Sequence, residues 1–251
     1  MAWYTSSMRV FRQGVSSLAY ARRGAGPPLV LLHGLSGSAA WWRRNVPALA
    51  QHFCVYTVDL MGFGKSRRQH PLPLREAARL LEAWLRALEL RQPRLIGHSM
   101  GAHIGLHLAA RYPLGALVLV AASALVKDPW WRLSLRLPQA AWHGAWEFLP
   151  TLAWDALRAG PRNLYRATQE IIRDDPAELL GHVHCPTLLV WGERDVLVTR
   201  PMGERLRESL ANSHLVVIPG AGHNVMYDRA TAFNATVIPF LLNPTEVLKT
   251  G

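Results

Sequence analysis

Short apolar runs of the length of a β-strand recur along the chain, and segments with helical periodicity separate them. Residues 29–32 are apolar at every position, which is typical of a parallel strand covered on both faces. One face of a helix predicted over residues 73–90 collects the apolar residues Leu74, Ala77, Ala78, Leu81, Leu85 and Leu88. Besides the strand that leads to Ser99, further strands are predicted at 8–12, 15–21, 53–58, 116–121, 187–191 and 215–218. Further helices are predicted at 41–50, directly after Ser99, from Thr199 and Pro201, and at 228–242. This alternation predicts an α/β protein with a mostly parallel, doubly wound sheet.

The alternation stops between residues 123 and 181, where no run has the features of a strand. Half of the ten tryptophans lie in this segment, namely Trp130, Trp131, Trp142, Trp146 and Trp154. We therefore predict a helical cap subdomain at 123–181, inserted after the sixth strand of a core made of residues 1–122 and 182–251. The tryptophans would cover an apolar substrate pocket, with Trp142 and Trp146 in contact with the substrate. Alternatively, they attach the cap to the core.

The composition favours a globular protein over a disordered or membrane-spanning one. Half of the 251 residues are apolar and 18% are charged, which is typical of a compact globular chain. No apolar run approaches the roughly 18 residues that span a bilayer, and residues 1–10 lack the features of a secretory signal. We therefore expect a cytoplasmic monomer or homodimer with no stable membrane insertion. We also expect a loosely held start and a loose tail beyond Asn243.

The formal charge of +11 suggests nucleic acid or an anionic membrane as a partner. The 28 basic residues are mostly arginines scattered along the chain without a dense cluster, so no nucleic-acid partner is expected. Cys54 and Cys185 each stand at the head of a predicted strand and are expected to be free, buried thiols.

The segment Gly97-His98-Ser99-Met100-Gly101 follows a predicted strand and opens a predicted helix. Glycines two residues on either side of a serine suit a sharp strand-to-helix turn, because a Cβ there would clash with the neighbouring strand and helix. The turn would expose the Ser99 hydroxyl as a nucleophile above the positive end of the helix dipole. The backbone N–H of Met100 would face an attacked carbonyl oxygen.

Two more loops follow predicted strands. In His33-Gly34-Leu35, Gly34 would allow a sharp turn and Leu35 would offer a second N–H to an oxyanion, whereas the alternative is an ordinary strand-end loop. The glycines between Asp59 and Ser66 match neither a dinucleotide fingerprint nor a P-loop, so we expect a turn held by Asp59 and no nucleotide.

A serine hydroxyl needs a nearby base, and the base needs a carboxylate that fixes its tautomer. His223 ends a glycine-rich loop after the last predicted strand, and Asp195 follows the strand before it. Glu193 is the rival carboxylate. Ser99, Asp195 and His223 are thus expected at the carboxyl edge of one sheet, in the chain order Ser, Asp, His.

With these motifs the chain resembles the α/β-hydrolase family over roughly residues 8–242. The segments that carry the resemblance are Gly97–Gly101, His33-Gly34-Leu35, Asp59–Ser66, Gly192–Asp195 and Gly220-Ala221-Gly222-His223. The resemblance implies an α/β-hydrolase fold with a helical cap. It also implies that Ser99 attacks an acyl carbonyl while His223 takes its proton, Asp195 orients His223, and Leu35 and Met100 bind the oxyanion. Ala102 stands where the family often has a second glycine after Gly101.

The expected activity is hydrolysis of carboxylic esters of small to medium apolar acids or alcohols, with no cofactor. The same residues suit carbon–carbon bond hydrolysis, lactone hydrolysis or perhydrolysis, and a non-catalytic receptor for a small ligand is a further alternative. Leu35 and His98 are expected to border the substrate, although His98 could instead pack at the helix start. Structural roles rather than metal ligation are expected for two histidine groups, His103 with His107 and His182 with His184 and Cys185.

Overall fold

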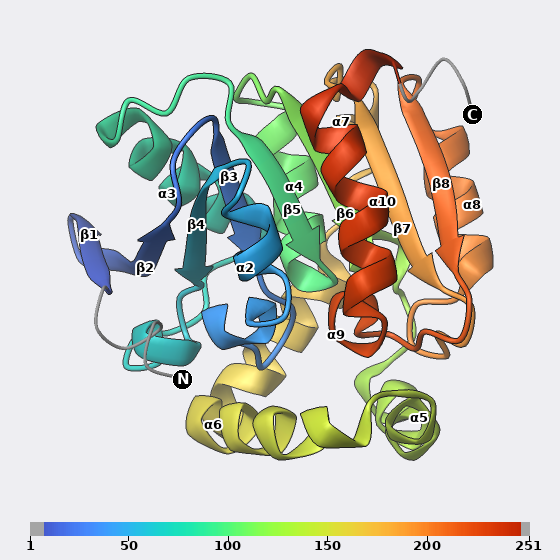
Figure 1. Ribbon diagram of the computed structural model, residues 1–251. Helices are drawn as coiled ribbons and strands as arrows, with labels where there is room; N and C mark the ends of the chain where they lie inside the picture. Colours follow the sequence, from blue (N-terminus) through green and yellow to red (C-terminus); the bar gives the residue numbers. More distant parts are fainter. Residues whose placement is uncertain (1–7, 247–251) are drawn as a thin grey trace.

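The computed structural model describes residues 8–246, so the expectations for the start of the chain and its last residues lie partly outside the described range. An eight-stranded sheet forms the centre of the molecule, in the order β1-β2-β4-β3-β5-β6-β7-β8 (Figure 1). The first two strands, β1 (Arg9–Gln13) and β2 (Ser16–Arg23), pair antiparallel, and β2 pairs antiparallel with β4. All other neighbours are parallel: β3 (Pro28–Leu32), β4 (Cys54–Asp59), β5 (Arg94–His98), β6 (Ala116–Val120), β7 (Thr187–Gly192) and β8 (Ser213–Ile218). The predicted mostly parallel, doubly wound sheet is confirmed.

Helices cover both faces of the sheet (Figure 1). One face is covered by α3 (Leu74–Ala87), α4 (Met100–Ala109) and α8 (Arg200–Glu208), and the other by α2 (Val46–Leu49) and α10 (Ala230–Leu242). Strand β3 shows why its residues are all apolar. Val30 and Leu32 belong to the first core, and Leu29 and Leu31 belong to the second. None of the helices described is long and apolar enough to cross a membrane.

The prediction of one continuous helix over residues 41–50 is wrong. The chain instead forms a 3-10 turn, η1 (Ala39–Trp42), and then the one-turn helix α2. Pro47 stands in the first turn of α2, where its missing N–H is tolerated, but it cannot continue an earlier helix. Before it, the buried Asn45 donates hydrogen bonds to the carbonyl of Met226 (2.9 Å) and to Asn234 Oδ1 (3.0 Å), which fixes the break.

The closing helix predicted at 228–242 is confirmed as α10. The one-turn helix α9 (Val225–Asp228) precedes it, and Arg229 between them has a non-helical φ of −133°. The turn after β4 is held by Asp59 as predicted. Its carboxylate accepts hydrogen bonds from the backbone N–H groups of Ala39 and Lys65, both at 2.7 Å, and the turn includes η2 (Gly64–Ser66). Both cysteines are free; Cys54 is buried as predicted, whereas Cys185 is only partly buried.

Between β6 and β7 the chain forms η3 (Ser123–Leu125), α5 (Trp130–His143), η4 (Trp146–Phe148), α6 (Leu149–Arg173) and α7 (Ala177–Leu180). Figure 1 shows α5 and α6 lying across one end of the sheet. Helix α6 turns one face inward, on which the side chains of Asp155, Ala159, Asn163, Ala167 and Ile171 are buried at four-residue spacing. The helix kinks at Gly160, which has a φ of 78° and precedes Pro161.

The five tryptophans of this segment point largely to solvent, with exposures from 48% to 71%. Trp142 and Trp146 contact each other edge to face, with ring centroids 5.7 Å apart. The aromatic contact of this segment with the core comes instead from Phe148, which is buried and stacks on Tyr227 of α9 at 4.0 Å. A substrate contact for Trp142 and Trp146 stays a prediction.

Candidate active site

Ser99 occupies a sharp turn between β5 and α4. Its φ of 50° and ψ of −112° are unusual for a residue that is not glycine, and such strain persists only where the surroundings enforce it. A Cβ on Gly97 would lie 2.5 Å from the carbonyl oxygen of Gly101, and one on Gly101 would lie 2.6 Å from the carbonyls of Leu32 and His33. The glycines are therefore required where the turn meets helix α4 and strand β3, as the sequence predicts.

The loop after β3 passes directly over this turn. A Cβ on Gly34 would lie 3.2 Å from the Ser99 Cβ. His33 holds the loop in place, because its Nε2 accepts a hydrogen bond from the Leu60 N–H (3.0 Å) and its Nδ1–H donates to the Gly34 carbonyl (2.7 Å). Full burial lowers the pKa of His33 to about 4, so the ring stays neutral with its proton on Nδ1. This arrangement keeps Gly34, the residue before Leu35, beside Ser99.

Met100 is the first residue of α4, so its N–H has no carbonyl one turn earlier in the helix to bind. The amide also lies at the positive end of the helix dipole. These properties suit a donor to a developing negative charge above Ser99.

Asp195 and His223 follow the neighbouring parallel strands β7 and β8, and their side chains form a hydrogen bond. Nδ1 of His223 lies 2.8 Å from Oδ2 of Asp195. Burial by itself lowers the pKa of His223, but the nearby Asp195 carboxylate outweighs burial, and the pKa is raised above its usual 6.5. Because Nδ1 donates to the carboxylate, Nε2 is left as the basic nitrogen.

The second oxygen of Asp195 is also occupied. Oδ1 accepts hydrogen bonds from the backbone N–H groups of Leu197 (2.9 Å) and Val198 (3.0 Å), which fixes the plane of the carboxylate. Glu193 has a different position. Its carboxylate accepts the N–H of Gly220 at 2.9 Å and so supports the loop before His223. Of the two carboxylates weighed in the sequence, Asp195 is the one that meets the histidine.

His98 lies between the two halves of the site. Its Nε2–H donates to the carbonyl of His223 at 3.0 Å, and the two rings lie 4.9 Å apart between centroids. Burial, followed by the nearby His223, lowers the pKa of His98 well below 6.5, so the ring is neutral. This hydrogen bond joins the end of β5 to the His223 loop, and the predicted contact of His98 with substrate stays a prediction.

Asp155 is a residue that the sequence did not single out. It projects from α6 into the body of the protein, where its Oδ2 accepts hydrogen bonds from Ser38 Oγ (2.8 Å) and Trp41 Nε1 (3.0 Å). Burial raises the pKa of this carboxyl. Asp155 thus ties α6 to the loop that carries Leu35. Nothing in the sequence signals this contact, because the partners are more than a hundred residues apart.

The chain was compared with known proteins. The profile of the alpha/beta hydrolase family matches residues 29–236. A pimeloyl-acyl-carrier-protein methyl ester esterase from Chromobacterium violaceum is 32% identical over 229 residues, covering 80% of this chain and 88% of that protein. A Yersinia enterocolitica protein provisionally named carbamate hydrolase RutD is 29% identical over 252 residues, covering 90% of this chain and 91% of that protein.

Among solved structures, the enol-lactonase from Burkholderia xenovorans superposes with a TM-score of 0.79 at 22% identity. The match covers 94% of this chain and all of the other, and at this identity it shows the fold alone. The family profile spans most of the chain, and the parallel part of the sheet, the Ser99 turn and the His223–Asp195 pair lie within the matched range. The protein described here is therefore a hydrolase that belongs to the alpha/beta hydrolase family.

Proposed function

We propose that this protein is a serine hydrolase that cleaves carboxylic esters of small to medium apolar acids or alcohols through an acyl-enzyme intermediate. The observation that carries the proposal is the 2.8 Å hydrogen bond between His223 Nδ1 and Asp195 Oδ2, at the sheet edge that also carries the strained Ser99 turn. A neutral imidazole held in this tautomer is what a serine hydroxyl needs as a base.

In the proposed reaction the Ser99 oxygen attacks the ester carbonyl while Nε2 of His223 takes the hydroxyl proton. The N–H groups of Leu35 and Met100 stabilise the resulting oxyanion, and losing one such donor typically lowers turnover by about 10²–10³. His223 then gives its proton to the leaving alkoxide, and the acyl group stays on Ser99. Water, deprotonated by His223, attacks the acyl-enzyme and releases the acid. No cofactor takes part in these steps.

A small apolar cavity lies beside Met100, and none of Ser99, Asp195 and His223 lines it. It has a volume of about 20 Å³, and Met100, Ile104, Leu60, Met61 and Ala167 are among its lining residues. A cavity of this size holds roughly one water-sized group. Because Ala167 belongs to α6, we propose that a larger acyl or alcohol group enters only as α6 moves outward, which fits a cap subdomain at residues 123–181.

Lactone hydrolysis is the second candidate, since a lactone is an internal ester and the fold resembles that of an enol-lactonase. The names of the two sequence relatives, a methyl ester esterase and a carbamate hydrolase, also describe acyl transfer to water. Carbon–carbon bond hydrolysis and perhydrolysis remain sequence-based alternatives. A cytoplasmic location and a monomeric or homodimeric state likewise stay sequence-based predictions.

The test combines a panel of p-nitrophenyl esters with a fluorophosphonate probe. We expect the parent protein to hydrolyse short esters and to be labelled at Ser99, and Ser99→Ala to lose both properties. Ser123→Ala is the matched control, because Ser123 is buried beside Ser99 and donates its backbone N–H to the Ser99 carbonyl. This variant should keep both activity and labelling. Labelling without ester turnover would favour the carbon–carbon alternative, and an unlabelled parent protein would indicate a receptor.

A further inference from the structure

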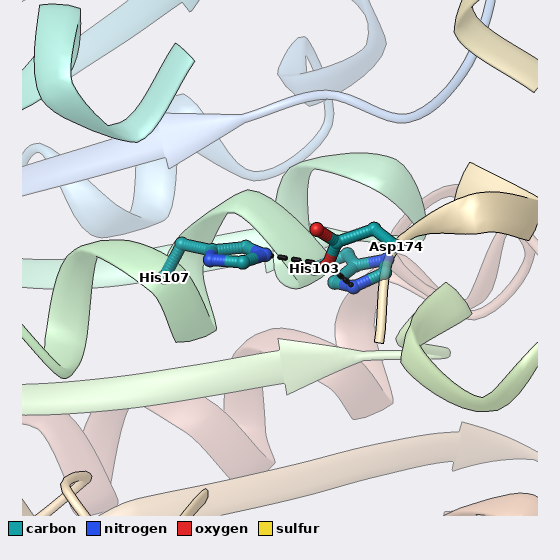
Figure 2. Close-up of side chains that lie close together, drawn as sticks. All are labelled: His103, His107 and Asp174. Atoms are coloured by element: carbon teal, nitrogen blue, oxygen red, sulfur yellow. Dashed lines mark hydrogen bonds and ion pairs between the residues drawn. The ribbon is translucent and has the colours of Figure 1, made fainter. Parts of the chain in front are cut away.

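A cluster of three side chains joins α4 to the end of α6. His103 and His107 lie one turn apart on α4, and Asp174 is the first residue after α6 (Figure 2). Oδ2 of Asp174 lies 2.9 Å from Nε2 of His103 and 2.6 Å from Nε2 of His107. The two imidazole rings stack at 5.7 Å, so both Nε2 atoms point toward the same carboxylate oxygen. All three side chains are nearly inaccessible, with exposures of 0%, 2% and 11%.

Hydrogen bonds alone do not satisfy this cluster. His107 makes a hydrogen bond to Asp174, and Nε2 of His103 lies 2.9 Å from the same carboxylate oxygen as an ion pair. Two ring nitrogens thus share one oxygen, and the buried Nδ1 of His103 has no hydrogen-bond partner among the described residues. Such a group in a native structure calls for an explanation, and a missing ion is one of the few available.

We propose that His103, His107 and Asp174 bind a divalent transition-metal ion, with Zn²⁺ as the best fit. The three candidate ligand atoms already lie within 4.8 Å of one another. Two histidines at positions i and i+4 of one helix place both nitrogens on the same side of an ion. Two imidazoles and one carboxylate oxygen suit zinc rather than calcium or magnesium, which prefer oxygen ligands.

Binding requires a small rearrangement. Ligand distances of about 2.0–2.2 Å in a tetrahedral site separate the ligand atoms from each other by roughly 3.3 Å. The present separations of 2.9 and 2.6 Å must therefore increase by about half an ångström, by a shift of Asp174 at the helix end. Water would complete the coordination.

Two cations also contact Asp174, and both are compatible with an ion. Arg75 Nε lies 3.4 Å from the other carboxylate oxygen, Oδ1, and so orients the carboxylate without occupying Oδ2. Lys127 donates to the backbone carbonyl of Asp174 at 2.6 Å, not to the carboxylate. Both side chains reach the cluster from the solvent side, where water screens their charge.

The ion would have a structural role. His103 donates its backbone N–H to the carbonyl of Ser99 at 3.1 Å, and Asp174 ends the helix that covers the site. Zinc would fasten the end of α6 to the helix that begins at the Ser99 turn.

The test titrates the full-length, EDTA-treated protein with ZnCl₂ against a chromophoric chelator, and with CoCl₂ by visible absorption. We expect one equivalent of zinc, a visible cobalt spectrum typical of four-coordination, and a Tm increase of roughly 5–10 °C at a hundredfold excess over Kd. His107→Asn and Asp174→Asn should each lose all three effects, whereas His184→Asn, an exposed control, should keep them.

No binding by the parent protein, or unchanged binding by either ligand variant, would overturn the site. If one ligand variant fails to fold, the cobalt titration of the other, compared with that of the parent protein, still tests the site. None of these readouts depends on the proposed esterase activity.

An independent observation concerns the outer surface of α5 and α6. Of the twelve exposed large hydrophobic side chains in the described chain, nine lie between residues 130 and 165, namely Trp130, Trp131, Leu135, Leu137, Trp142, Trp146, Trp154, Leu157 and Tyr165. We call residues 130–166 the tryptophan–arginine surface. Helix α5 has no buried side chain at all. A concentration of exposed apolar groups at one end of a molecule marks a contact surface.

The charges on this surface favour an anionic partner. Arg132, Arg136, Arg158, Arg162 and Arg166 lie within it, against two acidic residues, Glu147 and the buried Asp155. Asp128, just outside it, pairs with Arg136 at 2.9 Å and with Arg132 at 3.9 Å, so the remaining three arginines carry the excess positive charge. The guanidinium of Arg132 lies 5.1 Å from the Trp131 ring, and that of Arg158 lies 5.6 Å from Trp154. Tryptophan and arginine side by side on an amphipathic helix suit the headgroup region of a bilayer.

We propose that the tryptophan–arginine surface binds the surface of a membrane that contains anionic lipids, without inserting a helix across it. The formal net charge of +11 adds long-range attraction to such a membrane. The apolar side chains would enter the headgroup region while the arginines contact phosphates.

Sedimentation with phosphatidylcholine vesicles, with and without phosphatidylglycerol, tests this proposal. We expect binding only with the anionic lipid, weakened by salt, and reduced at least about tenfold in the triple variant Trp131→Ala, Leu135→Ala, Trp142→Ala. Leu242→Ala, which removes an exposed apolar side chain elsewhere, should bind as the parent does. Equal vesicle binding by the triple variant would overturn the proposal. So would a parent protein that does not bind vesicles but forms a dimer that the triple variant loses.

Discussion

Replacing Asp195 by asparagine tests the proposed proton transfer at one atom. Oδ1 of Asp195 accepts the N–H groups of Leu197 and Val198, so the carbonyl oxygen of an asparagine would take this position. Its NH₂ group must then face His223 Nδ1, where Oδ2 stands in the parent protein. An NH₂ group cannot accept a hydrogen bond, so the histidine would have to move its proton from Nδ1 to Nε2.

The expected effect is large. With the proton on Nε2, His223 cannot receive the hydroxyl proton of Ser99, and wrong-tautomer variants of this kind lose about 10⁴ in kcat. The loss corresponds to about 5.5 kcal/mol of transition-state stabilisation at about 1.4 kcal/mol per factor of ten. Folding should be little affected, because the two backbone hydrogen bonds to Oδ1 are retained.

The assay measures kcat and KM with a p-nitrophenyl ester, together with the Tm of each variant. Glu193→Gln is the matched control, since Glu193 supports Gly220 and does not contact His223 in the described structure. It should keep activity within about tenfold of the parent. A loss below tenfold in Asp195→Asn, with the parent fully active, would refute the assignment of the carboxylate.

Three further predictions follow from the geometry. Gly101→Ala places a Cβ 2.6 Å from two backbone carbonyls and should cost about 1–3 kcal/mol of stability and most of the activity. In Gly105→Ala the nearest atom to the new Cβ is a leucine side-chain atom at 3.0 Å, so this control variant should be tolerated. Thermal unfolding of the two variants checks the difference. Asp155→Ala leaves the donors of Ser38 and Trp41 without an acceptor and should lower the free energy of unfolding in urea by about 1–3 kcal/mol. Asp155→Asn keeps an acceptor oxygen and should lose less stability, so an equal loss in the two variants would contradict this prediction. The pKa of His223 is raised, and its protonated ring cannot act as a base. The value of kcat/KM should therefore fall as the pH decreases, with a midpoint above 6.5. A midpoint clearly below 6.5 would contradict the pairing of His223 with Asp195.

Most of the fold could be predicted from the sequence, because the signals are local. The apolar run at residues 29–32 requires a strand covered on both faces, and the glycines around Ser99 require a turn in which a Cβ has no room. The one clear error, the continuous helix at 41–50, arose because apolar periodicity outweighed Pro47 and because the bonds of Asn45 to residues near the end of the chain were not visible.

The tertiary structure alone decided which distant side chains meet. Sequence order placed Asp195 and Glu193 two residues apart, and only the path of the chain after β7 turned Asp195 toward His223 and Glu193 toward Gly220. In the same way, His103 and His107 had no third ligand until the end of α6 brought Asp174 to them. Local residue patterns fix strands, turns and helix faces because those depend on neighbours along the chain. Contacts across the fold depend on how whole elements pack, and the local pattern does not contain that information.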